Sequence, residues 1–208
     1  MPSVASIFTS MACLVAVTIA MPAASPTLST GTTPDSTQGK CPSGSATTRR
    51  GPSAMHNIFP KHPSLAKDSL GFHLETYSNA SQVEQVVAFT GIPAEAKDCS
   101  FGWDQGDRIQ RVFVVKGGDA LSGVRQLSGF PDKAITYDTI MPFDTSTKDI
   151  GGLDMTNWDD LEPQGHITGG VDCAEALYFK IALRNGNGNT KVFLGQDESN
   201  GVYITYSC

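Results

Sequence analysis

The sequence predicts an all-β fold, an antiparallel two-sheet β-sandwich that is stabilised by disulfides and follows a disordered N-terminal leader. Beyond residue 68 the apolar residues tend to alternate with polar ones, which is the period of a strand with one buried face. No segment shows a long helical period with capping residues. We expect about seven to nine short strands, although the pattern also allows a jelly roll or an open barrel.

The N-terminal part predicts export. Residues 1–20 carry no charged side chain, and their apolar run is too short to span a bilayer, so we interpret them as a signal peptide rather than a membrane anchor. Residues 21–53 are rich in Ser, Thr, Pro and Gly and predict a flexible leader. Residues 54–208 then form the β-sandwich domain.

A basic pair, Arg49-Arg50, closes the leader. Such a pair after a leader is a candidate processing site for secretory-pathway proteases, which would make Gly51 the first residue of the mature domain. Two ordinary solvated arginines are an equally good interpretation.

Cysteine usage agrees with an oxidising compartment. Cys13 lies in the signal peptide, which leaves an even set of four: Cys41, Cys99, Cys173 and Cys208. None belongs to a C-x2-C or C-x4-C pair, so two disulfides are favoured over a zinc site. In such a compartment the sequon at Asn79 predicts N-glycosylation.

Several segments carry the strand pattern in the first half of the domain. Residues 69–77 place Leu70, Phe72 and Leu74 on one face, and residues 109–116 align Ile109 with Phe113 and Val115. Further strands are expected over 84–92, 99–105 and 134–140 and around Ile167.

The C-terminal third predicts a meander. Residues 176–184, 190–195 and 202–208 alternate strongly, and the sequence NGNGN between the first two supplies a hairpin turn. Cys208 shares the parity of Val202, Ile204 and Tyr206 and is expected to fix the terminus by a disulfide. In a meander Cys173 and Cys208 would lie at opposite ends, so their pairing is the least expected. Cys99 should pair with either Cys173 or Cys208, and Cys41 should pair with the one of these two that Cys99 leaves free.

The net charge and the absence of known catalytic motifs narrow the range of expected functions. The formal charge of −6 and the lack of basic clusters argue against nucleic-acid binding. We find no motif of the G-x-S-x-G, H-E-x-x-H, Walker or dinucleotide-binding type, so no catalytic residue and no cofactor is predicted, and the chain is not expected to be an enzyme. The spacing of His56, His62 and His73 matches no common metal-ligand pattern.

One acidic loop is the best candidate binding site. Asp154, Asp159, Asp160, Glu162 and His166 fall within it. A solvated loop is the favoured interpretation, ahead of a weak Ca²⁺ site or the paired carboxylates of a glycosidase.

The two tryptophans have different expected positions. Trp103 should be a core residue. Trp158, at the centre of the acidic loop, could be exposed as a sugar-stacking or partner-contact residue, but a tryptophan folded over the sandwich edge is favoured.

A family resemblance completes the sequence evidence. The segments MHNIFP, VVAFTGIP with KDCSF, VDC, a Gly/Asn turn and the terminal GQDESNGVYITYSC occur in order, and this order resembles the fungal ubiquitin-three-binding protein (But-two) C-terminal domain family over residues 54–208. Cys173 is followed by Ala174-Glu175-Ala176, where the family has Pro-Ala-Gly. The resemblance implies a mostly secreted, β-rich protein. The cytosolic contact in the family name is not carried over, because a signal peptide and disulfides direct the chain elsewhere.

These observations predict a secreted fungal protein, extracellular or associated with the cell wall, that works as a non-enzymatic structural or interaction domain. Cell-wall glycan or an extracellular or host protein is the expected partner, and no membrane span is expected in the mature protein. The alternative is a carbohydrate-binding module or a glycan-active hydrolase that uses the loop 154–166.

Overall fold

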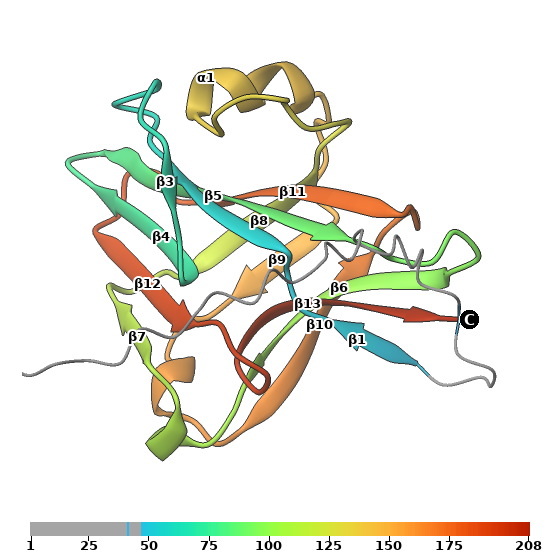
Figure 1. The fold of residues 1–208 in the computed structure, drawn as a ribbon. Coiled ribbons are helices and arrows are strands. Elements are labelled where there is room, and N and C mark those ends of the chain that lie inside the picture. The colour runs from blue at the N-terminus through green and yellow to red at the C-terminus, as the bar shows by residue number, and fades with distance from the viewer. Residues whose placement is uncertain (1–40, 42–46) are drawn as a thin grey trace, which may run out of the picture. The chain divides into compact units, whose positions relative to one another are not determined.

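The structure, a computed structural model, describes residue 41 and residues 47–208. These residues form two antiparallel sheets (Figure 1). The smaller sheet has the strand order β1-β13-β6-β10. Its strands are β1 (Thr48–Arg50), β6 (Lys97–Gln105), β10 (Gln164–Gly170) and β13 (Gly201–Ser207). The predicted signal peptide and most of the predicted leader lie outside the described residues.

The larger sheet has nine strands. Seven follow the order β7-β12-β4-β5-β11-β8-β9, while β2 pairs with β5 and β3 pairs with β2. The bounds are β2 (Ala54–Ile58), β3 (Lys67–Asp68), β4 (Gly71–Tyr77), β5 (Ala80–Thr90), β7 (Phe113–Lys116), β8 (Leu121–Gln126), β9 (Gly151–Asp154), β11 (Ala176–Leu183) and β12 (Thr190–Gly195). Several of these strands are too short for alternation to show, so the sequence predicts fewer.

The core lies between the two sheets. The ring of Phe101 in β6 lies 5.0 Å from that of Phe179 in β11 and 5.9 Å from that of Phe89 in β5. All three side chains are fully buried, as is Trp103 of β6. Aromatic side chains bury large areas and favour such edge-to-face contacts. The predicted two-sheet sandwich is therefore confirmed.

The C-terminal strands do not form the predicted meander. β11 pairs with β5 and β8, β12 pairs with β4 and β7, and β13 pairs with β6 and β1. The three strands are thus each paired with strands distant in sequence, and the turn after β11 joins strands that are not neighbours. The predicted faces are correct, since Val202, Ile204 and Tyr206 are buried in the core.

The sandwich also begins before the predicted residue 54. β1 lies in the region predicted as leader, and its Arg49 and Arg50 pair with Thr205 and Ile204 of β13. The apolar period could not reveal β1, because a strand of three mostly polar residues on a sheet edge has almost no alternation.

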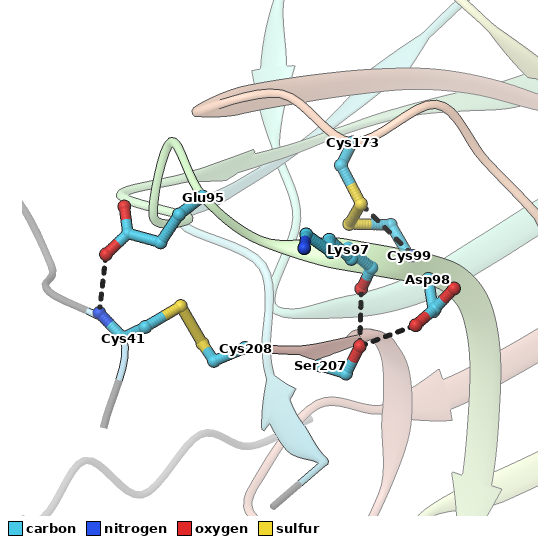
Figure 2. Close-up of a disulfide and its surroundings, with 8 residues drawn as sticks. All are labelled: Cys41, Glu95, Lys97, Asp98, Cys99, Cys173, Ser207 and Cys208. Atoms are coloured by element: carbon cyan, nitrogen blue, oxygen red, sulfur yellow. Dashed lines mark hydrogen bonds between the residues drawn. A yellow bond between two sulfur atoms is a disulfide. The ribbon is translucent and has the colours of Figure 1, made fainter. Parts of the chain in front are cut away.

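Two disulfides cross-link the domain (Figure 2). Cys99 is bonded to Cys173, and Cys41 is bonded to Cys208. This is one of the two connectivities that the sequence left open, and Cys173 and Cys208 are not paired. The Cα atoms are 5.3 Å and 5.4 Å apart, the usual spacing for a disulfide. The Cys41–Cys208 bond therefore connects the segment before β1 to the end of β13.

A segment of mixed structure covers the outer face of the larger sheet. It contains α1 (Tyr137–Ile140) and the 3₁₀ turn η2 (Met141–Phe143), so the predicted strand over 134–140 is wrong. A capping box explains the helix, because Thr136 and Thr139 satisfy each other's main-chain N–H groups. Ile140 is then buried in a second cluster with Ile58 and Val86.

Four charged side chains connect this cover to the sheet. Lys180 of β11 lies 2.8 Å from Glu84 of β5 and 3.3 Å from Asp144, which follows η2. Arg125 of β8 also pairs with Asp144, at 2.7 Å. The side chains of Lys180, Glu84 and Asp144 are less than one-tenth exposed. Buried charges of this kind need their partners, because each would otherwise pay the full cost of desolvation.

No helix in the described part of the chain is long and apolar enough to cross a membrane.

Candidate interaction surface

The acidic loop runs between β9 and β10 along one end of the sandwich. It begins at Asp154, the last residue of β9, and contains the 3₁₀ turn η3 (Trp158–Asp160). Asn157 precedes η3 with a φ of 63°, a left-handed conformation that asparagine tolerates better than most residues. This turn directs Trp158 back toward the core, where it packs as a half-buried side chain.

Trp158 is part of an aromatic cluster. The ring of His166 in β10 stacks on Trp103 at 4.1 Å with an interplanar angle of 8°. Trp158 meets the same imidazole edge-on at 4.2 Å and lies 6.1 Å from Trp103. The favoured prediction, a tryptophan folded over the sandwich edge, is confirmed.

The aromatic cluster favours the neutral form of His166. Burial lowers the pKa of His166 below its usual range, and the nearby Asp104 opposes that shift only in part. The Nε2 atom is buried without a hydrogen-bond partner. Protonation there would place a charge between two tryptophans with no acceptor in reach.

Three of the loop carboxylates, those of Asp154, Asp159 and Asp160, each have a different structural contact. Asp154 accepts a hydrogen bond from the Thr156 N–H at 3.0 Å. Asp159 accepts one from the Val115 N–H at 2.9 Å, and Asp160 pairs with Arg108 at 2.7 Å. Among residues 41 and 47–208, no three potential metal ligands come together. The loop carboxylates thus hold the loop in place rather than converge on one point.

Arg111 holds the acidic loop against the neighbouring loop 106–112. Its guanidinium donates to the carbonyl oxygens of Gly106, Asp159 and Leu161 at 2.6, 2.9 and 2.6 Å. No role for this residue was predicted from the sequence. A signal was available, because Arg111 interrupts an otherwise apolar alternation, and a charge at such a position often has a specific partner.

Exposed apolar side chains surround this junction. Ile109, in the 3₁₀ turn η1 (Arg108–Gln110), is 93% exposed, Val112 is 62% exposed and Leu161 is 45% exposed. Leu70 is 92% exposed and lies at the same end of the sandwich. Its neighbour Gly71 pairs with Gly195, and the Gly195 N–H donates to the carbonyl oxygen of Val112. We call these four residues the apolar rim.

Two members of the apolar rim lie in positions that differ from the sequence prediction. Leu70 and Ile109 were predicted to face inward with their strands. Leu70 precedes the first residue of β4, and Ile109 lies in η1 before β7 begins, so neither belongs to the strand that the period-two pattern assigned. Apolar side chains that stay exposed on a folded loop are candidates for contacts with another molecule.

The remaining candidate residues lie apart from this surface. Asn79 is exposed at the tip of the β4–β5 hairpin with a φ of 56°, a position open to a glycan. His56 pairs with Asp68 and His73 with Glu75, at 2.8 and 2.7 Å, while His62 is exposed. The three histidines share no ligand cluster within the described residues.

No protein-family model matches the chain, and no curated protein resembles it significantly. The resemblance to the But-two C-terminal domain family therefore stays a prediction from the sequence.

Proposed function

We propose that the chain is a secreted, non-enzymatic interaction domain that binds a protein partner at the cell surface or outside the cell through the apolar rim. The observation that carries this proposal is the exposure of Ile109 and Leu161 on two loops that Arg111 fixes together. A fixed loop loses little conformational freedom on binding, and a few well-packed, desolvated side chains near the centre of an interface supply most of its free energy.

The two disulfides support action outside the cell. Disulfides form and persist in oxidising compartments, and here they close the chain at Cys208. The predicted signal peptide agrees with this placement. The fungal origin is inferred from the sequence resemblance.

The surface favours a protein partner over a glycan. Sugars usually stack on the open face of an aromatic ring, but one face of Trp103 is covered by His166, and Trp158 is half-buried in the same cluster. The apolar rim is aliphatic. The carboxylates of Asp154, Asp159 and Asp160 are 2.7–3.0 Å from separate structural partners, which disfavours the hydrolase that we considered as an alternative.

A cell-wall binding experiment tests the proposal. Fluorescently labelled wild-type protein and an Ile109→Ser variant would be added to isolated fungal cell walls, with and without prior protease treatment of the walls. We expect binding to fall at least tenfold for Ile109→Ser and after protease treatment. Met141→Ser is the matched control, because Met141 is 40% exposed and directly follows α1, which lies far from β7 (Figure 1).

The same experiment distinguishes the alternative. Binding that survives both protease treatment and Ile109→Ser, and that is displaced by soluble cell-wall glycan, would contradict the proposed protein contact and favour a carbohydrate-binding module.

A further inference from the structure

The two arginines at the end of the predicted leader have different surroundings. Arg49 faces the outer side of the smaller sheet, where its guanidinium lies 3.1 Å from the carboxylate of Asp104 and 4.4 Å above the ring of Tyr203. It also donates to the carbonyl oxygen of Glu198. Arg49 is therefore an anchor that holds β1 on the sheet.

The shape of the sheet helps to form this anchor. Tyr203 lies directly over Gly102, where a Cβ atom would be only 2.7 Å from the tyrosine Cζ. The ring can therefore lie flat on the sheet and present its face to Arg49. A cation above an aromatic face, paired with a carboxylate, is a stable combination.

The segment around the Arg50–Gly51 bond is accessible. Arg49, Arg50 and Gly51 are all exposed, and β1 is an edge strand of its sheet, paired with β13 on one side only. The linker Gly51-Pro52 borders a hollow of about 500 Å³ that Gln196, Asp197 and Glu198 line from the other side. The Arg50–Gly51 peptide bond thus lies at an open edge of the protein.

The disulfide Cys41–Cys208 joins the two sides of this bond, because Cys41 precedes Arg50 and Cys208 follows Gly51. We propose that Arg50–Gly51 is cleaved by a protease that recognises paired basic residues, and that the product stays together as a two-chain protein. Hydrolysis adds one water molecule, which leaves a carboxylate on Arg50 and an amine on Gly51. No other bond changes, so the segment that ends at Arg50 remains attached through Cys41, and β1 can keep its pairing with β13.

Cleavage would change what the disulfide does. In the intact chain Cys41 is connected to the domain twice, through the peptide chain and through Cys208. After cleavage the disulfide is the only covalent connection, and reduction of this one bond would free the N-terminal segment. The contacts of Arg49 and the pairing of β1 with β13 would then be the non-covalent restraints.

Intact-mass measurement of the secreted protein tests the proposal. Without reductant we expect the mass of the uncleaved chain plus one water molecule. After reduction we expect two species, one that ends at Arg50 and one that begins at Gly51. An uncleaved chain after reduction would overturn the cleavage, and loss of the N-terminal segment without reductant would overturn the retention.

Variants separate the two parts of the proposal. Arg50→Gln should abolish cleavage, whereas the matched control Arg108→Gln changes an exposed arginine outside the pair and should leave cleavage unchanged. The double variant Cys41→Ser, Cys208→Ser should still be cleaved but should lose the segment without reductant. Retention in this double variant would show that the disulfide is not the tether. These masses do not depend on the apolar rim, so they test this inference independently of the proposed function.

Discussion

Arg111 donates a hydrogen bond to the carbonyl oxygen of Leu161 at 2.6 Å, across 50 residues of sequence. The same guanidinium reaches Asp159 and Gly106, so one side chain connects the two loops that carry most of the apolar rim. Three carbonyl groups would be left without this partner if the guanidinium were removed. The partly buried guanidinium of Arg111 therefore holds the loops of the apolar rim in position.

The first prediction concerns this connection. Arg111→Ala should lower the free energy of unfolding by about 2–3 kcal/mol, because hydrogen bonds to a charged group contribute more than neutral ones. Amide hydrogen exchange in the loops 106–112 and 155–163 should also become faster. Arg108→Ala is the control, since its pair with Asp160 is exposed and should contribute less than about 0.5 kcal/mol. Equal effects of both variants would contradict the assigned role of Arg111.

The second prediction concerns the buried charges under α1. Lys180→Met should cost about 3–5 kcal/mol of stability, because Glu84 and part of the charge of Asp144 lose their partner in a buried site. Lys191→Met is matched to it: that lysine also pairs with a glutamate, Glu75, but is 49% exposed. We expect a loss below about 1 kcal/mol there. Urea unfolding of both variants measures the difference, and similar losses would mean that the Lys180 network is open to solvent.

The third prediction concerns pH. Burial lowers the pKa of His166 in the folded protein below its ordinary value of 6.5, so the unfolded chain binds a proton more readily. Protonation of His166 therefore leaves the free energy of unfolding unaffected above pH 6.5 and lowers it as the pH falls below that value.

The variant His166→Phe isolates this contribution, because it keeps a ring between Trp103 and Trp158 but cannot be protonated. The difference in unfolding free energy between the variant and wild type should grow in favour of the variant as the pH falls from about 7.5 to about 5.5. A difference that does not change with pH would show that His166 is not buried as a neutral ring. The same comparison cancels the other histidines, which are present in both proteins.

The faces of the longer strands were predictable from the sequence. Val202, Ile204 and Tyr206 are buried as their parity indicated, and Phe101 and Trp103 lie in the core. Burial of one face requires a period of two, so alternation reports it directly. The same argument placed Cys208 on the core side, where it packs at the edge of the cluster.

The partners of these strands were not predictable in the same way. Alternation says which face of β12 is buried but not that β4 and β7 lie beside it. The predicted meander came from proximity in sequence, whereas all-β sandwiches are dominated by non-local pairings. The expectation that Cys173 does not pair with Cys208 agrees with the structure, although the meander from which it was argued is absent.

The candidate site shows a second limit of sequence patterns. The acidic loop was recognised, but its carboxylates bond to Val115, Thr156 and Arg108 individually. Composition identifies such a group of residues and cannot tell whether their oxygen atoms converge. The apolar rim was missed because the predicted strands were extended to include Leu70 and Ile109. Both residues lie in turns, where the side chains do not alternate between the core and the solvent.

The last prediction concerns Trp158. Trp158→Ala should lower the free energy of unfolding by about 2 kcal/mol, since it removes a half-buried indole and its contacts with Trp103 and His166. Trp158→Phe should cost about half as much, because a smaller ring keeps part of the edge contact. Near-ultraviolet circular dichroism should weaken in both variants as the paired tryptophans are separated. An Ala variant with wild-type stability that fails to bind cell walls would instead make Trp158 a direct contact residue, and would move the proposed binding surface from the aliphatic rim to the aromatic cluster.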